Sequence, residues 1–169
     1  MAGRTPRPRH AGLTASRDGG GSRFAVVAAR FNEPITKKLV DGALHAFAAA
    51  RVSAADVEVH WVPGAFELPQ AAAHLARTRR YAAIVCLGVV IRGQTPHFEL
   101  IGREAAAGIR EVGLRTGVPT TFGVVTALTE EQAWERAGGQ VANRGQEAAE
   151  AAVEMAAFVR RRQPGPRQR

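Results

Sequence analysis

The stretch LGVVIRGQTPHFE, residues 87 to 99, decides the fold, because it joins the end of an apolar run to a group of polar residues. The run begins at Ala82 and continues without a charged residue to Ile91. Continuous apolar runs of this kind, rich in Val and Ile, are typical of strands that are buried on both faces of a parallel sheet. We therefore predict a central buried strand that delivers polar side chains at its carboxyl end.

The residues after this strand predict where the next helix begins. Gly93 permits a sharp turn, Thr95 is a favoured helix N-cap, and Pro96 suits the first helical position, where no amide hydrogen is needed. We expect a helix from about Thr95 that carries His97 in its first turn. Its unpaired amides, with those of Gly93 and Gln94, would form an anion site suited to phosphate. On this segment alone, a plain capping or surface role for His97 stays equally open.

Working outward, similar patterns predict three more strands, at residues 23–29, 56–62 and 120–126. Apolar residues at helical spacing and N-cap signals predict helices at residues 34–50, 67–79, 95–115, 129–137 and 143–161. In the last helix we expect an inward face made of Ala148, Ala152, Met155, Ala156 and Val159. Strands that alternate with helices form parallel sheets covered on both faces, so the predicted fold class is α/β, a three-layer α/β/α sandwich with a four-stranded parallel sheet.

The two termini differ in composition from the body between them. Residues 1–22 are rich in Arg, Pro and Gly and carry four arginines and one aspartate, and residues 160–169 carry five arginines. Residues 23–159 hold fourteen basic and fourteen acidic side chains, so the net charge of +8 lies in the termini. We predict a disordered basic arm, one folded domain and a basic tail. Because nucleic-acid binding usually needs a basic face on the folded body, we do not expect a nucleic-acid partner.

Several common kinds of site are disfavoured by the sequence. Residues 88–95, GVVIRGQT, approach the P-loop pattern, but Gln94 stands where the phosphate-binding lysine belongs. We find no His, Cys, Asp or Glu set at metal-ligand spacing and expect neither a metal nor a cofactor. Cys86 is the single cysteine and lies within the apolar run, which indicates a buried thiol. No apolar stretch approaches the ~18 residues of a membrane span and no secretory signal is visible, so we expect no membrane partner and a cytoplasmic location.

Aromatic and polar residues follow three of the predicted strands. Phe31 and Asn32 follow the first strand, residues 65–67 follow the second, and residues 89–97 end the third. Open α/β sheets bind ligands beyond the carboxyl ends of their strands, so we expect these residues to meet along one edge. Phe31 alone is also compatible with a hydrophobic plug, and Glu67 alone with a charge favoured by the helix dipole. Their convergence favours a binding site.

Six short motifs occur in one order along the chain: ARFNEPIT (29–36), WVPGAFELP (61–69), LGVVIRGQTPHFE (87–99), FGVVT (122–126), ERAGG (135–139) and NRG (143–145). Together they resemble the lumazine synthase family, over residues 23 to 158. The resemblance implies a flavodoxin-like fold and a transferase of riboflavin biosynthesis. Its reaction condenses 5-amino-6-(D-ribitylamino)uracil with 3,4-dihydroxy-2-butanone 4-phosphate to give 6,7-dimethyl-8-ribityllumazine, phosphate and water.

The resemblance also implies roles for individual residues. The pyrimidine ring would contact Phe31, Phe122 and the backbone of Val89, Val90 and Ile91; the ribityl chain would contact Ala65, Phe66 and Glu67; and the phosphate would contact Gln94, Thr95, Arg136 and Arg144. Arg144 stands where many family members have lysine, which leaves its role uncertain. His97 would be the catalytic residue that assists proton transfer. A helix start favours its neutral form and a bound phosphate favours its cation, and the sequence leaves both open.

Family members place Phe122 and Arg136 across a subunit boundary, so the resemblance implies a homo-oligomer built from pentamers with shared sites. The short segment between Arg136 and Arg144 permits a shell of sixty subunits, while pentamers and decamers stay open. Riboflavin synthase is a further partner compatible with the resemblance. The alternative to an enzyme is a non-catalytic relative that binds flavin or lumazine or forms a shell.

Overall fold

The computed structural model describes residues 18–162, in which four parallel strands alternate with helices and two successive helices follow the last strand, giving five α-helices. The strands are β1 (Phe24–Ala29), β2 (Val57–Val62), β3 (Ala83–Ile91) and β4 (Thr120–Ala127). The helices are α1 (Glu33–Ala49), α2 (Leu68–Arg77), α3 (His97–Thr116), α4 (Glu130–Arg136) and α5 (Arg144–Arg162). Two 3₁₀ turns, η1 (Ala54–Asp56) and η2 (Ala65–Glu67), flank β2. The predicted α/β class and the four-stranded parallel sheet are confirmed.

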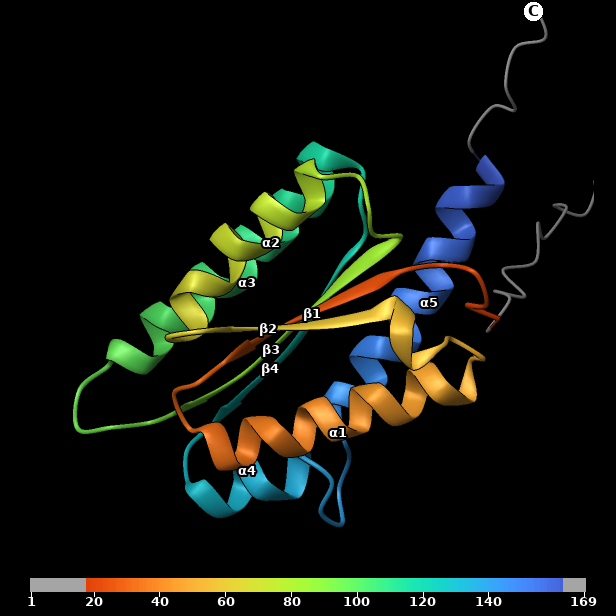
Figure 1. Cartoon of the computed structure of the whole chain (residues 1–169). Coiled ribbons are helices and arrows are strands. Elements are labelled where there is room, and N and C mark those ends of the chain that lie inside the picture. Colours follow the sequence, from red (N-terminus) through yellow and green to blue (C-terminus); the bar gives the residue numbers. More distant parts are fainter. Residues whose placement is uncertain (1–17, 163–169) are drawn as a thin grey trace, which may run out of the picture.

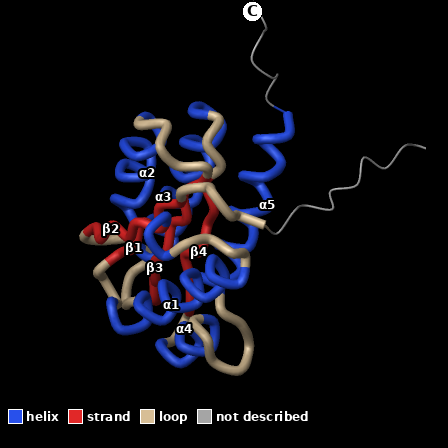
Figure 2. Tube along the Cα trace, turned by 45° about the vertical axis from the view of Figure 1, so that its right-hand side comes forward, coloured by secondary structure: helices blue, strands red, loops and turns tan. Residues whose placement is uncertain are grey.

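The sheet has the strand order β2-β1-β3-β4. In Figure 1, α2 and α3 lie on one side of the sheet and α1, α4 and α5 on the other, which is the predicted three-layer sandwich. Figure 2 shows the helices surrounding the strands from a second direction. The chain moves outward from β1 to β2 in one direction and from β3 to β4 in the other. The order therefore reverses between β1 and β3, and open sheets bind ligands at the carboxyl end of such a reversal.

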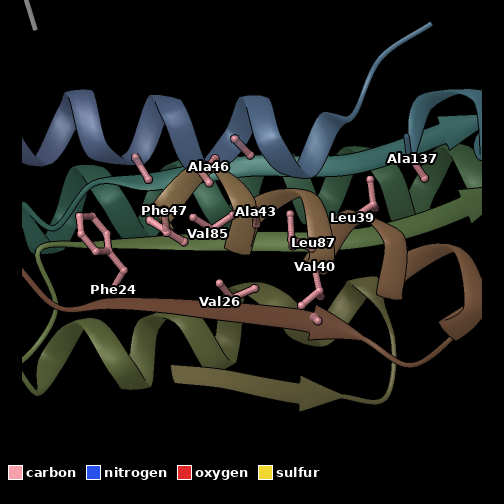
Figure 3. Close-up of a cluster of buried hydrophobic side chains, with 14 of the residues drawn as sticks. Phe24, Val26, Leu39, Val40, Ala43, Ala46, Phe47, Val85, Leu87 and Ala137 are labelled. Carbon is pink, nitrogen blue, oxygen red and sulfur yellow. The ribbon is translucent and has the colours of Figure 1, made fainter. Parts of the chain in front are cut away.

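One half of the core lies between the sheet and the pair α1 and α5. Alternate strand residues such as Val26 and Val85 meet Leu39 and Phe47 of α1, as Figure 3 shows. The rings of Phe24 and Phe47 have centroids 4.7 Å apart and are tilted by 36°, a favourable aromatic contact. Each fully buried side chain of this size stabilises the fold by about 1.5–3 kcal/mol.

The other half of the core lies between the sheet and the pair α2 and α3. It takes the remaining alternate residues, including Val27 of β1 and Ile84 and Cys86 of β3, which pack with Leu68 and Ile109. All six residues of β1 are buried, as are the first eight of β3. This burial on two faces explains why these segments read as continuous apolar runs.

Helices α1 and α5 approach each other closely where α5 begins. A Cβ atom on Gly145 would overlap the backbone carbonyl of Leu39 in α1. Asn143 caps α5, since its Oδ1 accepts from the N–H groups of Gly145 at 3.0 Å and Gln146 at 3.1 Å. Its Nδ2 donates to the carbonyl oxygen of Lys38 at 3.2 Å. The predicted cap at Asn143 is confirmed, and it also ties α5 to α1.

Helix α3 begins two residues after the predicted start at about Thr95 and carries His97 in its first turn, as predicted, but the N-cap role predicted for Thr95 is wrong. The helix begins at His97, and Pro96 occupies the N-cap position without a side-chain capping bond. The first turn closes through a bond from the N–H of Glu99 to the carbonyl of Pro96, 3.0 Å long. This three-residue spacing is a tight 3₁₀-type turn, which starts the helix after the proline and leaves Thr95 in the preceding loop.

The predicted inward face of α5 is wrong at Met155. Its side chain is 44% exposed and that of Val159 is partly exposed, while Ala149 and Val153 are buried instead. The helix is so rich in alanine that small apolar residues occur on every side of it. The spacing of apolar residues therefore did not determine which side faces the sheet.

The last residues of the predicted basic arm lie against the folded body. The N–H of Gly19 donates to the carbonyl of Ala50 at 2.9 Å, and Asp18 forms an ion pair with Arg51. At the other end, α5 continues to Arg162, three residues into the predicted tail. The rest of the predicted arm and tail, residues 1–17 and 163–169, lies outside the described residues.

We predict that Gly145→Ala destabilises the protein by about 3 kcal/mol, because α1 and α5 must separate to accommodate the new methyl group. Chemical denaturation at a fixed protein concentration measures the free energy of unfolding. Gly93→Ala is the matched control, since nothing lies within 4 Å of a Cβ atom at Gly93 and its backbone is not left-handed. Equal stability of the two variants would contradict the close approach of the helices.

Candidate active site

Phe31 lies outside the core at the end of β1. Its side chain is 72% exposed, although phenylalanine is usually buried. The next residue, Asn32, has a left-handed backbone with φ 60° and ψ 38° and leads directly into α1. The side-chain amide of Asn32 donates to the carbonyl oxygen of Val89 at 3.0 Å. The loop thereby holds Phe31 at the edge of the sheet, next to β3.

The loop after β2 turns through η2. Ala65 is buried, Phe66 is exposed and Glu67 is half-buried. A Cβ atom on Gly64 would lie 3.1 Å from Oε2 of Glu67, so the glycine leaves room for the carboxylate. This segment presents one carboxylate and one aromatic ring at the same edge as Phe31.

Strand β3 carries its apolar residues up to this edge. Val89 and Val90 are buried and Ile91 is partly buried. The N–H of Arg92 donates to the carbonyl of Ala127 at 2.9 Å, after which the chain leaves the sheet. Residues 92–97 are all exposed, so His97 stands at the surface as the first residue of α3.

These three segments surround a cavity of about 500 Å³, which we call the β1–β3 cavity. Nine of the predicted site residues line this cavity: Phe31, Ala65, Phe66, Glu67, Val89, Val90, Ile91, Thr95 and His97. Gln94 is the one predicted residue of this edge that does not line it; it lies in the exposed loop. The cavity sits at the reversal of strand order between β1 and β3, as the rule for open sheets requires.

The remaining predicted site residues, Phe122, Arg136 and Arg144, line a separate hollow of about 430 Å³ along β4 and α5, which we call the β4–α5 hollow. Phe122 is 44% exposed there. Arg136 is half-buried and donates one N–H to the carbonyl of Gln132 at 2.9 Å. Arg144 forms an ion pair with Glu147 at 2.5 Å. None of the described residues lines both the hollow and the β1–β3 cavity.

Cys86 lies in β3 and is not a nucleophile. Its side chain is fully buried, and burial raises the pKa of its thiol to about 12. A thiol with such a pKa stays protonated near neutral pH and therefore unreactive. The predicted structural role of this cysteine is confirmed.

A group of charged residues lies at the opposite, amino ends of the strands. Tyr81 donates its hydroxyl to Glu58 at 2.5 Å, and Arg23 and Arg80 pair with the same carboxylate at 2.9 and 3.2 Å. The bond from Tyr81 lowers the pKa of Glu58, and burial raises the pKa of Tyr81. These side chains satisfy one another, which is the pattern of a structural cluster.

Within residues 18–162, no group of three or more His, Cys, Asp or Glu side chains is placed to hold a metal ion. In the same range, no helix is both long enough and apolar enough to cross a membrane.

The β1–β3 cavity combines groups suited to a flat polar ligand. Phe31 and Phe66 offer aromatic faces, the free edge of β3 offers backbone donors and acceptors, and Glu67 offers a carboxylate for hydroxyl groups. His97 stands at the start of α3, where helix amides favour a bound anion and an imidazole can transfer protons. The arrangement could hold a flat ring that carries hydroxyl groups, with an anion at the start of α3.

Sequence reasoning did not assign a role to several lining residues. Pro63, Phe98 and Ile101 line the cavity, and Asn32 bridges two of its walls. The two apolar residues of α3 follow His97 at positions that face the sheet, so helical spacing was the available signal. Asn32 was placed correctly at the strand end, but no local pattern indicates its bond to Val89.

The family model described as 6,7-dimethyl-8-ribityllumazine synthase matches residues 21–160, which is most of the 169-residue chain. The match includes every segment that forms the β1–β3 cavity and the β4–α5 hollow.

Proposed function

The chain belongs to the 6,7-dimethyl-8-ribityllumazine synthase family, and from this premise we propose that it catalyses the condensation of 5-amino-6-(D-ribitylamino)uracil with 3,4-dihydroxy-2-butanone 4-phosphate. The products are 6,7-dimethyl-8-ribityllumazine, inorganic phosphate and two molecules of water. The observation that carries the proposal is the gathering of Phe31, Glu67, the end of β3 and His97 around one cavity of about 500 Å³. A cavity of this size suits a ligand with one ring and a short chain.

The pyrimidine substrate would occupy the β1–β3 cavity. The ring would stack on Phe31, a contact worth about 1 kcal/mol beyond burial, and would bond to the backbone of Val89, Val90 and Ile91. The ribityl hydroxyls would bond to the segment from Ala65 to Glu67. The high exposure of Phe31 supports this role, because a stacked ring would cover it.

The phosphate of the second substrate would lie near the start of α3. Backbone amides of Gln94 and Thr95 would hold it, together with the guanidinium of Arg136 from an adjacent protomer. Arg136 lines a different hollow from His97 in its own chain and donates one N–H to the carbonyl of Gln132. Among residues 18–162 its other donors have no partner, so they could reach a neighbouring protomer. Phe122 would cover the ring from the same hollow, and Arg144 would add a positive charge beside the phosphate.

The chemistry needs several proton transfers. The ring-bound primary amine attacks the ketone and water leaves to give an imine. Phosphate is then eliminated and the resulting enol tautomerises to a carbonyl. The second nitrogen attacks this carbonyl, and a second water leaves as the ring closes. His97 is the imidazole at the cavity and would carry protons in these steps. Holding the two substrates together would supply much of the remaining acceleration.

We also propose that the protein works as a homo-oligomer built from pentamers. Two larger assemblies follow from this proposal and can be tested: a shell of sixty subunits, and a complex with riboflavin synthase. The β1–β3 cavity carries Phe31 and His97, and the β4–α5 hollow carries Phe122 and Arg136. These groups support a head-to-tail association, in which the β1–β3 cavity of one protomer meets the β4–α5 hollow of the next. Light scattering of the purified full chain measures the size of the assembly.

We predict that the purified protein forms 6,7-dimethyl-8-ribityllumazine when the two substrates are mixed with it, well above the rate without protein. The absorbance and fluorescence of the product measure the rate. Binding of the lumazine without product formation would instead favour the non-catalytic alternative, and neither binding nor turnover would reject the assignment of the cavity.

We predict that His97→Ala lowers kcat about a hundredfold but does not abolish turnover, because proton transfer is lost while the substrates are still held together. Steady-state rates with both substrates measure the effect. His74→Ala, an exposed histidine on α2 outside the cavity, is the control and should leave kcat unchanged. Complete loss of turnover with unchanged substrate binding would contradict the proposal that proton transfer by His97 supplies only part of the rate acceleration.

We predict that two damaged chains restore activity when they are unfolded and refolded together. One carries Arg136→Ala, and the other carries Phe31→Ala with His97→Ala. If each site takes its two halves from different protomers, about a quarter of the sites in a random mixture are intact. The refolded mixture should exceed the mean activity of the separate variants, and mixing without refolding is the control. Activity that stays at that mean would show that each site lies within one chain.

A further inference from the structure

The backbone turns away from β3 at the end of β1. In a regular strand, successive N–H groups point alternately to the two neighbouring strands. Here the N–H groups of Arg30 and Phe31 both donate towards β2, to the carbonyls of Val62 at 2.8 Å and Pro63 at 3.1 Å. The chain therefore leans towards β2 and leaves the last part of β3 without a strand on that edge.

The side chain of Asn32 bonds to β3 at a position where β1 no longer pairs with it. Its Nδ2 donates to the carbonyl of Val89 at 3.0 Å in a partly buried setting. This bond gives a partner to the carbonyl of Val89, which lies beyond the last pair of β1 with β3. It also joins the loop after β1 to the exposed edge of β3. This hydrogen bond therefore connects two walls of the β1–β3 cavity.

The backbone of Asn32 is adapted to this bond at the expense of helix capping. Its left-handed conformation, with φ 60°, is one that asparagine and glycine tolerate best. An asparagine at an N-cap usually accepts a hydrogen bond from a helix amide, but Asn32 makes no such capping bond. Its side chain points to Val89 instead.

We propose that Asn32 is a positioning residue for the pyrimidine substrate. By holding the carbonyl of Val89, it fixes the gap between Phe31, which faces the ring, and the backbone of β3 at Ile91, which faces the edge of the ring. The inference rests on the proposed function. Asn32 itself need not touch the substrate, because it acts through the two groups that it holds in place.

The test uses Asn32→Gly in the full-length protein. Glycine adopts the left-handed backbone freely, so this change removes the amide and keeps the turn. We expect the KM for the pyrimidine to rise about tenfold, as for the loss of a partly buried hydrogen bond that leaves a carbonyl without its partner. The KM for the butanone phosphate should stay unchanged, because its contacts lie at the start of α3 and on the neighbouring protomer.

Asn32→Asp is the second variant, and it keeps the shape of the side chain while replacing the donor with a carboxylate that repels the carbonyl of Val89. It should raise the pyrimidine KM at least as much, and it decides the question if Asn32→Gly does not fold. Arg79→Gly is the matched control, because Arg79 is also left-handed, with φ 56°, and lies in the turn after α2 outside both the cavity and the hollow. It should change neither KM.

The outcomes separate this proposal from the proposed function. A purely structural role for Asn32 predicts a lower melting temperature and fewer active sites with both KM values unchanged, and that result would overturn the proposal while leaving the function intact. If the natural protein makes no product, titration with 6,7-dimethyl-8-ribityllumazine replaces the kinetics. Tenfold weaker binding by Asn32→Gly would then uphold the role of Asn32 without the reaction, and no binding by the natural protein would overturn both.

Discussion

Strand β3 extends further than its neighbour β1, and the candidate site depends on that difference in length. β1 has six residues and β3 has nine, with Ala28 of β1 paired to Leu87 of β3. The free end of β3 is tolerated because its other edge pairs with β4 as far as Ile91 and its faces remain covered. The loops after β1 and β2 fold around this free edge. The cavity thus lies where strand order reverses, at a position set by the sheet itself.

The sheet could be predicted because its central strands are buried on both faces. β1 and β3 contain only apolar residues, so the pattern identifies them without any knowledge of their neighbours. Details that depend on tertiary contacts could not be predicted. The alanine-rich α5 offers several similar faces, and its packing on α1 selects the one that excludes Met155. The start of α3 depends on a tight first turn after Pro96, whereas the N-cap preference of Thr95 is only a local tendency.

The two halves of the candidate site differ in how they could be predicted. The strand-end rule alone brings Phe31, η2 and the end of β3 together, and the structure places them around one cavity. Nothing in the strand pattern brings Phe122 or Arg136 to that cavity; their roles came from the family resemblance, and in one chain they line the separate β4–α5 hollow. The bond from Asn32 to Val89 spans 57 residues, so no local pattern encodes it.

The two ends of the sheet use their charges differently. At the amino ends, the Glu58 carboxylate is bonded by Tyr81, Arg23 and Arg80, so its hydrogen-bonding capacity is used within the fold. At the carboxyl ends, Glu67 and His97 form no ion pair within residues 18–162. Polar groups that stay solvated in the free protein gain partners only when a ligand replaces the water. The carboxyl end of the sheet therefore carries polar side chains that can exchange water for a ligand, whereas the carboxylate of Glu58 at the amino end is bonded within the fold.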